Sequence, residues 1–154
     1  MNIYGLGVKY GGFTANSRDI FDECIEHNFW CMGYDEKDKF EKLIAEVKIG
    51  DIVFAKAFYY ENPRDFSIRS IGFVTDKSIP NTVPEEFKNK HGFAVQWTTI
   101  FKLNWHLLST DDFMPQGFMK CIPKDNSRLG TIYRETNDSI ILRIIKEMNG
   151  PLIK

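Results

Sequence analysis

The sequence predicts an α+β fold in which a small, strongly curved β-barrel is flanked by helices, as one domain over residues 1–154. Three observations predict this fold. Strand-like runs dominate the centre of the chain, their connections suit antiparallel hairpins, and amphipathic helical stripes lie towards the two ends. The length suits one hydrophobic core, and an aromatic content of 14% is typical of a β-rich core or a stacking surface.

The first elements are a strand and a helix. Residues 2–12 alternate apolar and other side chains and end in a glycine pair, which predicts a strand and a turn. Residues 14–28 carry an apolar stripe at helical spacing, with Asn16 or Ser17 as the N-cap and Asn28 as the end.

A second helix and a hairpin follow. Residues 35–51 have an inward apolar stripe that stops at Gly50, so they predict a helix. Residues 51–60 and 67–76 are rich in β-formers and predict two strands. The Asn-Pro-Arg-Asp stretch at 62–65 is typical of the connection in a hairpin.

The next part of the chain predicts one long strand between two loops. Residues 80–92 predict a loop that contains a short helix. Residues 93–108 alternate clearly, but the parity slips near Thr98-Thr99, which predicts a bulge or a bend. Residues 109–130 form a loop long enough to suspect function or its own substructure.

The C-terminal part predicts a short strand over residues 131–135 and a closing helix over 137–150, capped by Asn137 or Asp138.

The whole chain has a net charge of −1, which does not indicate a nucleic-acid binder by itself. Residues 118–154, however, contain seven Lys/Arg and four Asp/Glu, so a local basic face is compatible with the sequence.

Cysteine usage and the start of the chain indicate a reducing, cytoplasmic location. The three cysteines cannot form a closed disulfide set, and we expect neither a signal leader nor a membrane segment. Cys24, His27 and Cys31 have metal-like spacing, but a zinc site needs a fourth ligand from far away and Cys24 belongs to an apolar stripe. We therefore predict no metal and no cofactor.

Two segments resemble the core hairpin of the PUA-like superfamily, especially its EVE and YTH branches. They are VKIGDIVFAKAF over residues 47–58 and IRSIGFVTD over residues 68–76. The shared pattern is a helix, a Lys-x-Gly-Asp turn, a strand and an Ile-Gly-x-Val strand. The segment FWCMGYD over 29–35 lies where that group often places a tryptophan, and the resemblance covers roughly residues 1–105.

This resemblance implies a nucleic-acid-binding module that holds a base, frequently a modified one, in an aromatic pocket at the mouth of a small barrel. The implied partner is DNA or RNA, or a nucleotide-like small molecule. No catalytic residue is predicted for such a module.

The resemblance places the pocket on four residues. Trp30 and Tyr34 are candidates for its wall, because every base presents a flat face to a stacking ring. Lys56 is a candidate for a phosphate or base contact, and Trp97 or Trp105 for a further ring. Two alternatives stay open, since Trp30 also suits the core and Lys56 also suits a solvent-facing position on an alternating strand.

Further candidates are Ser17, Arg18 and Arg69. Ser17 and Arg18 at the predicted start of the first helix offer amide donors and a guanidinium to an anion, although a simple N-cap explains them equally. We expect Arg69 to lie across from Lys56 and to extend a basic patch.

Two other functions fit the same residues. One is an ASCH-like hydrolase of nucleic acid or modified nucleosides, with Lys56, Tyr34 and Asp35 as its working groups. The other is a nucleotide-capturing accessory protein of a phage or defence system, which suits a short chain without a fused catalytic domain.

Overall fold

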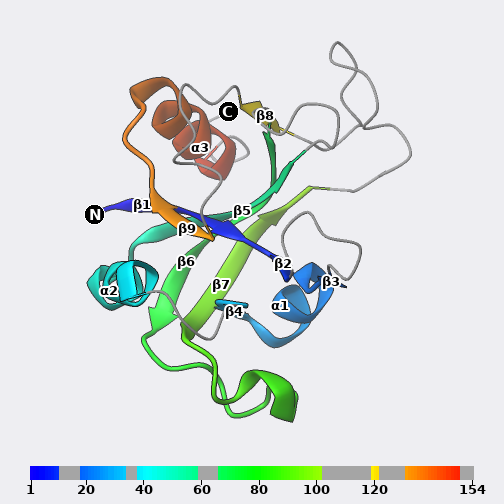
Figure 1. Cartoon of the computed structure of the whole chain (residues 1–154). Helices are drawn as coiled ribbons and strands as arrows, with labels where there is room; N and C mark the ends of the chain where they lie inside the picture. Colours follow the sequence, from blue (N-terminus) through cyan, green and yellow to red (C-terminus); the bar gives the residue numbers. More distant parts are fainter. Residues whose placement is uncertain (11–17, 34–37, 59–65, 102–118, 122–130, 150–154) are drawn as a thin grey trace.

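The computed structural model describes residues 1–10, 18–33, 38–58, 66–101, 119–121 and 131–149. Figure 1 shows the arrangement of the helices and strands. Their bounds are β1 Ile3–Gly7, β2 Lys9–Tyr10, β3 Arg18–Asp19, α1 Phe21–His27, β4 Phe29–Cys31, α2 Asp38–Glu46, β5 Ile52–Phe58, β6 Phe66–Asp76, η1 Glu85–Phe87 (a 3-10 helix), β7 Gly92–Ile100, β8 Met119–Cys121, β9 Ile132–Arg134 and α3 Asp138–Asn149.

Seven strands form one mixed sheet. Its order is β4-β7-β6-β5-β1-β9, and β8 pairs with β6 off this path. β1 and β5 are parallel, and the other pairs in this sheet are antiparallel. The sheet curls strongly into a half-barrel with helices beside it (Figure 1), so the predicted α+β class with a small curved sheet is confirmed at this level. β2 and β3 form a separate antiparallel ribbon.

The side chains of β5 alternate between two hydrophobic clusters. Val53 and Ala55 belong to the first cluster, whereas Ile52 and Phe54 belong to the second. Successive residues of a strand point to opposite faces, so the sheet has apolar packing on both sides. α1 and α2 contribute to the first cluster, and α3 contributes Ile144 to the second. None of the helices within the described ranges is long and apolar enough to cross a membrane.

The predicted irregularity near Thr98-Thr99 is confirmed. Ile71 of β6 pairs with Thr99 of β7, but the next residue, Gly72, pairs with Trp97. Thr98 is therefore an extra residue, and its Oγ1 donates to the carbonyl oxygen of Ile71 at 3.1 Å. An extra residue on one strand increases the local bend and twist, which contributes to the curl of the sheet.

The first helix is shorter than predicted. Residues 14–28 were expected to be helical, but α1 begins at Phe21, because Arg18 pairs with Tyr10 in the β2-β3 ribbon. Asn28 ends α1 as predicted and has the left-handed conformation, with φ of 54°. β4 begins at the next residue, so Phe-Trp-Cys is a strand and not a link between two helices.

Three other predictions have mixed outcomes. The second helix ends at Glu46, before the expected stop at Gly50, which has a φ of 93°. β8 lies inside the segment 109–130 that was expected to be a loop. The N-cap of α3 is confirmed as Asn137, whose Oδ1 accepts the backbone N–H of Ile140 at 3.1 Å.

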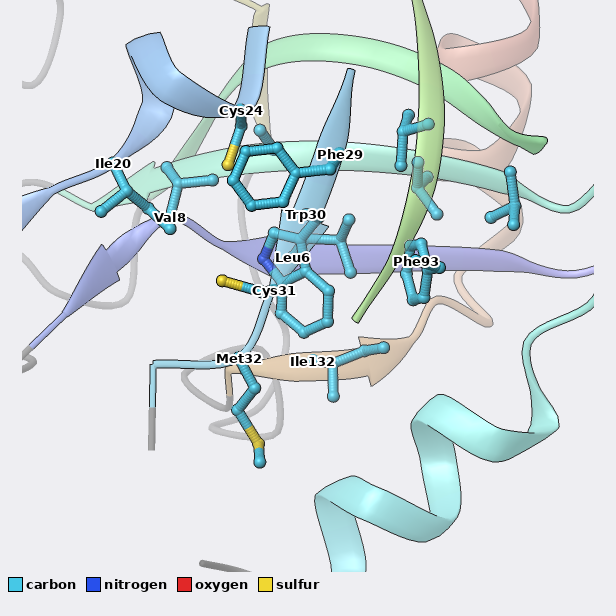
Figure 2. Packing of buried hydrophobic residues seen from close by; sticks show 14 of the residues in the cluster. Leu6, Val8, Ile20, Cys24, Phe29, Trp30, Cys31, Met32, Phe93 and Ile132 are labelled. Atoms are coloured by element: carbon cyan, nitrogen blue, oxygen red, sulfur yellow. The ribbon is translucent and has the colours of Figure 1, made fainter. Parts of the chain in front are cut away.

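Two indole N–H groups connect elements across the first cluster. Trp30 Nε1 donates to the carbonyl oxygen of Gly7 at 2.8 Å, which connects β4 to β1. Trp97 Nε1 donates to the carbonyl oxygen of Cys24 at 3.2 Å, which connects β7 to α1. Figure 2 shows Trp30 within the cluster, and its ring centroid lies 5.3 Å from that of Phe93.

Replacement of Trp30 by Phe is expected to lower the free energy of unfolding by about 2–3 kcal/mol. The change leaves the Gly7 carbonyl without the indole donor and removes part of a buried ring. Urea denaturation followed by circular dichroism measures this. Leu142→Ala, at an exposed position of α3, is the control and is expected to change stability by less than about 0.5 kcal/mol. Equal stability of Trp30→Phe and wild type would contradict a structural role for the indole.

Candidate functional site

Two of the three tryptophans named as candidates, Trp30 and Trp97, are core residues. Trp30 is 0% exposed and Trp97 is also buried. Both indole N–H groups are engaged by backbone carbonyl oxygens. The packing alternative therefore describes Trp30, since its ring has no exposed face on which a base can stack.

Lys56 is also buried, at 3% exposed, so it does not occupy the solvent-facing position that was one of the two alternatives. Its Nζ lies 4.5 Å from the ring centroid of Tyr133, which belongs to the second cluster. Trp30 belongs to the first cluster. The structure thus places the Lys56 ammonium against the second cluster and the Trp30 indole inside the first, and not at one mouth.

Arg69 does not lie across from Lys56 as expected. Lys56 pairs with Ile68, whereas Ala55 pairs with Ser70, which leaves Arg69 as an extra residue on β6. Bulges redirect the side chains of the bulged strand. The Arg69 guanidinium consequently contacts Phe21, a residue of the first cluster, whereas the Lys56 ammonium contacts Tyr133 of the second cluster.

Arg69 is buried against β3 and α1. It is 3% exposed, and its Nη1 donates to Asp19 Oδ2 at 2.7 Å. Its guanidinium carbon lies 3.9 Å from the ring centroid of Phe21, close enough for a cation–π contact. Burial lowers the pKa of Arg69, and the negative charge of Asp19 opposes that change. The pairing with Asp19 offsets part of the cost of burying this cation.

Arg18 is the accessible one of the two predicted arginines, with a side chain that is 47% exposed. Its Nη1 donates to Glu86 Oε2 at 2.9 Å and its Nη2 to Glu86 Oε1 at 2.8 Å. Nη2 also donates to Glu23 Oε1 at 3.2 Å. These hydrogen bonds, with that to Glu86 foremost, raise the pKa of Arg18, and the same contact lowers the pKa of Glu86.

We name Arg18, Asp19, Phe21, Arg69 and Glu86 the arginine cluster. Asp19 joins its two cations, because it neighbours Arg18 in β3 and forms the ion pair with Arg69. Both arginines were predicted as site residues from separate parts of the sequence, and the structure links both to β3, Arg18 as one of its residues and Arg69 through Asp19.

The electrostatics of the arginine cluster differ from those of the expected basic patch. The two guanidinium groups face three carboxylates, those of Asp19, Glu23 and Glu86. An incoming anion therefore meets Arg18 already paired with a carboxylate. To contact Arg18, an anion must replace the carboxylate that already holds it. Simple attraction to a positive surface does not describe this contact.

Several predicted residues lie outside the part of the chain that the structure describes. They are Ser17, Tyr34, Asp35 and Trp105. Asp19, Phe21 and Glu86 belong to the cluster but were not predicted as site residues. The sequence contained only local signals for them, since Asp19 suited a helix start and Glu86 a short helix. No spacing rule connects Glu86 to Arg18, because η1 and β3 meet only in the folded chain.

Cys24, His27 and Cys31, which have metal-like spacing in the sequence, lie within the described ranges. The described ranges contain no group of three or more His, Cys, Asp or Glu side chains able to hold a metal ion. Cys24 and Cys31 are both buried. Burial raises the pKa of Cys24 well above its ordinary value, with a smaller contribution from Cys31. A protonated, buried thiol is a poor nucleophile and a poor ligand.

Comparisons with known proteins give no assignment. The chain matches no protein-family model, and no curated protein is similar to it in sequence.

The buried Cys24 thiol predicts a loss of stability at alkaline pH. Its pKa is raised in the folded state, so its contribution is present below the unfolded pKa of about 8.5 and is lost as pH rises. Between about pH 8 and 10, the unfolding free energy of wild type is expected to fall more steeply than that of Cys24→Ala, by up to about 1.4 kcal/mol per pH unit.

Urea denaturation at several pH values measures the two slopes. Val53→Ala removes buried apolar atoms without a titrating group and is the control, expected to keep the wild-type slope. Parallel slopes for wild type and Cys24→Ala would contradict the role of this thiol.

Proposed function

We propose that this protein binds nucleic acid through the arginine cluster, with Arg18 as a phosphate contact on a PUA-like half-barrel. The observation that carries the proposal is the place of Arg18 in β3, directly next to Asp19, the residue that pairs with the buried Arg69. The Arg69 guanidinium is buried and holds Asp19, whereas the side chain of Arg18, the neighbouring residue in β3, is exposed. A strand fixed by a buried ion pair gives its accessible arginine a defined position, which suits the binding of an anionic ligand.

The chemistry of Arg18 supports a phosphate as the ligand. A guanidinium group presents a planar fork of N–H donors that matches the oxygen atoms of carboxylate and phosphate alike. Both terminal nitrogens of Arg18 already hold the two oxygens of one carboxylate. The side chain is thus oriented for bidentate contact, and a phosphate group has the same requirement.

Arg69 has a positioning role in this proposal. Its contacts with Asp19 and Phe21 hold β3 and the first turn of α1 against β6. Asp19 Oδ1 also accepts the backbone N–H of Phe21 at 2.9 Å, so one carboxylate stabilises both the ion pair and the start of the helix. The same contacts fix the backbone of Arg18, because Arg18 directly precedes Asp19 in β3.

The base contact in this proposal differs from the one first expected. Trp30 is buried and supplies no stacking surface, so Tyr34 is the remaining candidate for the pocket wall. The strong curl of the sheet and the resemblance to PUA-like domains support a base held at the end of the half-barrel. Capture of a single nucleotide would use the same phosphate contact. Experiments with ligands of different lengths distinguish it from binding of a nucleic-acid strand.

Fluorescence anisotropy with labelled single-stranded DNA, single-stranded RNA and duplex DNA tests the proposal. We expect wild-type binding at low salt that weakens as salt increases, because phosphate contacts release counterions. Arg18→Gln is expected to weaken binding several-fold and to reduce the slope of log K against log salt by about 1. Excess unlabelled mononucleotide is expected to displace the labelled strand as well as excess unlabelled strand does only if a nucleotide, and not a polymer, is the ligand.

Arg143→Gln is the matched control. Arg143 is also an exposed arginine paired with a glutamate, Glu147, at 3.1 Å, but it lies on α3. The two variants change the net charge equally. Absence of binding by wild type at low salt would refute the proposed function, and equal effects of the two variants would remove Arg18 from it.

A further inference from the structure

Glu86 occupies the guanidinium group of Arg18, the part of this exposed side chain that is proposed to contact phosphate. Glu86 takes both terminal nitrogens of Arg18, at 2.9 and 2.8 Å, whereas Glu23 contacts only one of them, at 3.2 Å. A carboxylate in this bidentate position has the geometry that a phosphate oxygen pair adopts on arginine. Glu86 therefore fills the same positions that an anionic ligand needs.

Glu86 is able to leave Arg18 at small cost. The side chains are 47% exposed for Arg18 and 50% exposed for Glu86, so water replaces each partner when they separate. Exposed ion pairs of this kind contribute little to stability and are weakened by salt. The pair is closed in this structure, but it is not locked by burial.

The segment that carries Glu86 is held by contacts other than the ion pair with Arg18. Phe87, the next residue, is buried in the first cluster, and its ring centroid lies 5.3 Å from that of Phe29. The backbone N–H of Phe87 also donates to the carbonyl oxygen of Pro84 at 3.0 Å. η1 thus keeps its place when the ion pair opens, and Glu86 stays near Arg18 as a permanent competitor.

We propose that Glu86 is an intramolecular competitor for the phosphate contact of Arg18, which makes the arginine cluster self-inhibited. This inference rests on the proposed function and adds a regulation to it. A phosphate group displaces Glu86 from the guanidinium fork, while Glu23 keeps its contact with Nη2. The competitor selects against weak or singly contacting anions, because a ligand must replace two hydrogen bonds to reach Arg18.

Glu86→Gln tests the inference, because it removes the charge of the competitor and keeps its size. Glu85→Gln is the matched control, since Glu85 is the adjacent exposed glutamate and pairs with Lys88 at 2.9 Å, not with Arg18. Both variants gain the same net charge. In anisotropy titrations with labelled single-stranded DNA and RNA, Glu86→Gln is expected to bind about two- to fivefold more tightly than Glu85→Gln.

The same substitutions in an Arg18→Gln background identify the route of the effect. If Glu86 acts through Arg18, Glu86→Gln and Glu85→Gln have equal affinities in that background. A persistent difference there would overturn the inference, because the gain would then come from general repulsion of the ligand.

The outcomes separate the inference from the function on which it rests. Wild-type binding with equal affinities of Glu86→Gln and Glu85→Gln overturns the competitor and leaves nucleic-acid binding intact. Absence of binding by wild type, Glu86→Gln and Glu85→Gln at low salt overturns both. Circular dichroism and the unfolding midpoint of each variant are expected to match those of wild type, because Phe87 and not Glu86 anchors η1.

Discussion

The ion pair between Arg69 and Asp19 is the constraint on which the arrangement of the candidate site depends. A guanidinium that is almost fully buried is costly unless a carboxylate and other contacts accompany it. Asp19 meets that need with one oxygen and accepts the first N–H of α1 with the other. β3, the start of α1 and β6 are thereby joined at one point, and Arg18 is presented to solvent beside it.

Two buried tryptophans help to hold the first cluster together. Trp30 and Trp97 each combine a large buried ring with an N–H that reaches a backbone carbonyl on another element. Such side chains provide apolar area and one directional contact, which explains why they suit the junction of β4, β7 and α1. The site is then built on the polar margin of this core and not within it.

The sequence predicted the α+β class, the antiparallel pairing of β5 with β6, the irregularity near Thr98, the end of α1 at Asn28 and the cap of α3, because each depends on local patterns. The parallel pairing of β1 with β5 was not predicted, since register between distant strands has no local signal. Arg18 and Arg69 were identified as candidates, but Glu86 was not. A contact between η1 and β3 depends on the tertiary fold alone.

The central claim is that Asp19 and Arg69 stabilise one another and so fix β3, and a double-mutant cycle measures it most directly. Unfolding free energies of wild type, Asp19→Asn, Arg69→Met and the double variant give the coupling between the two side chains. A buried, hydrogen-bonded ion pair predicts a coupling of about 1–3 kcal/mol. Additive effects, with a coupling near zero, would contradict the account.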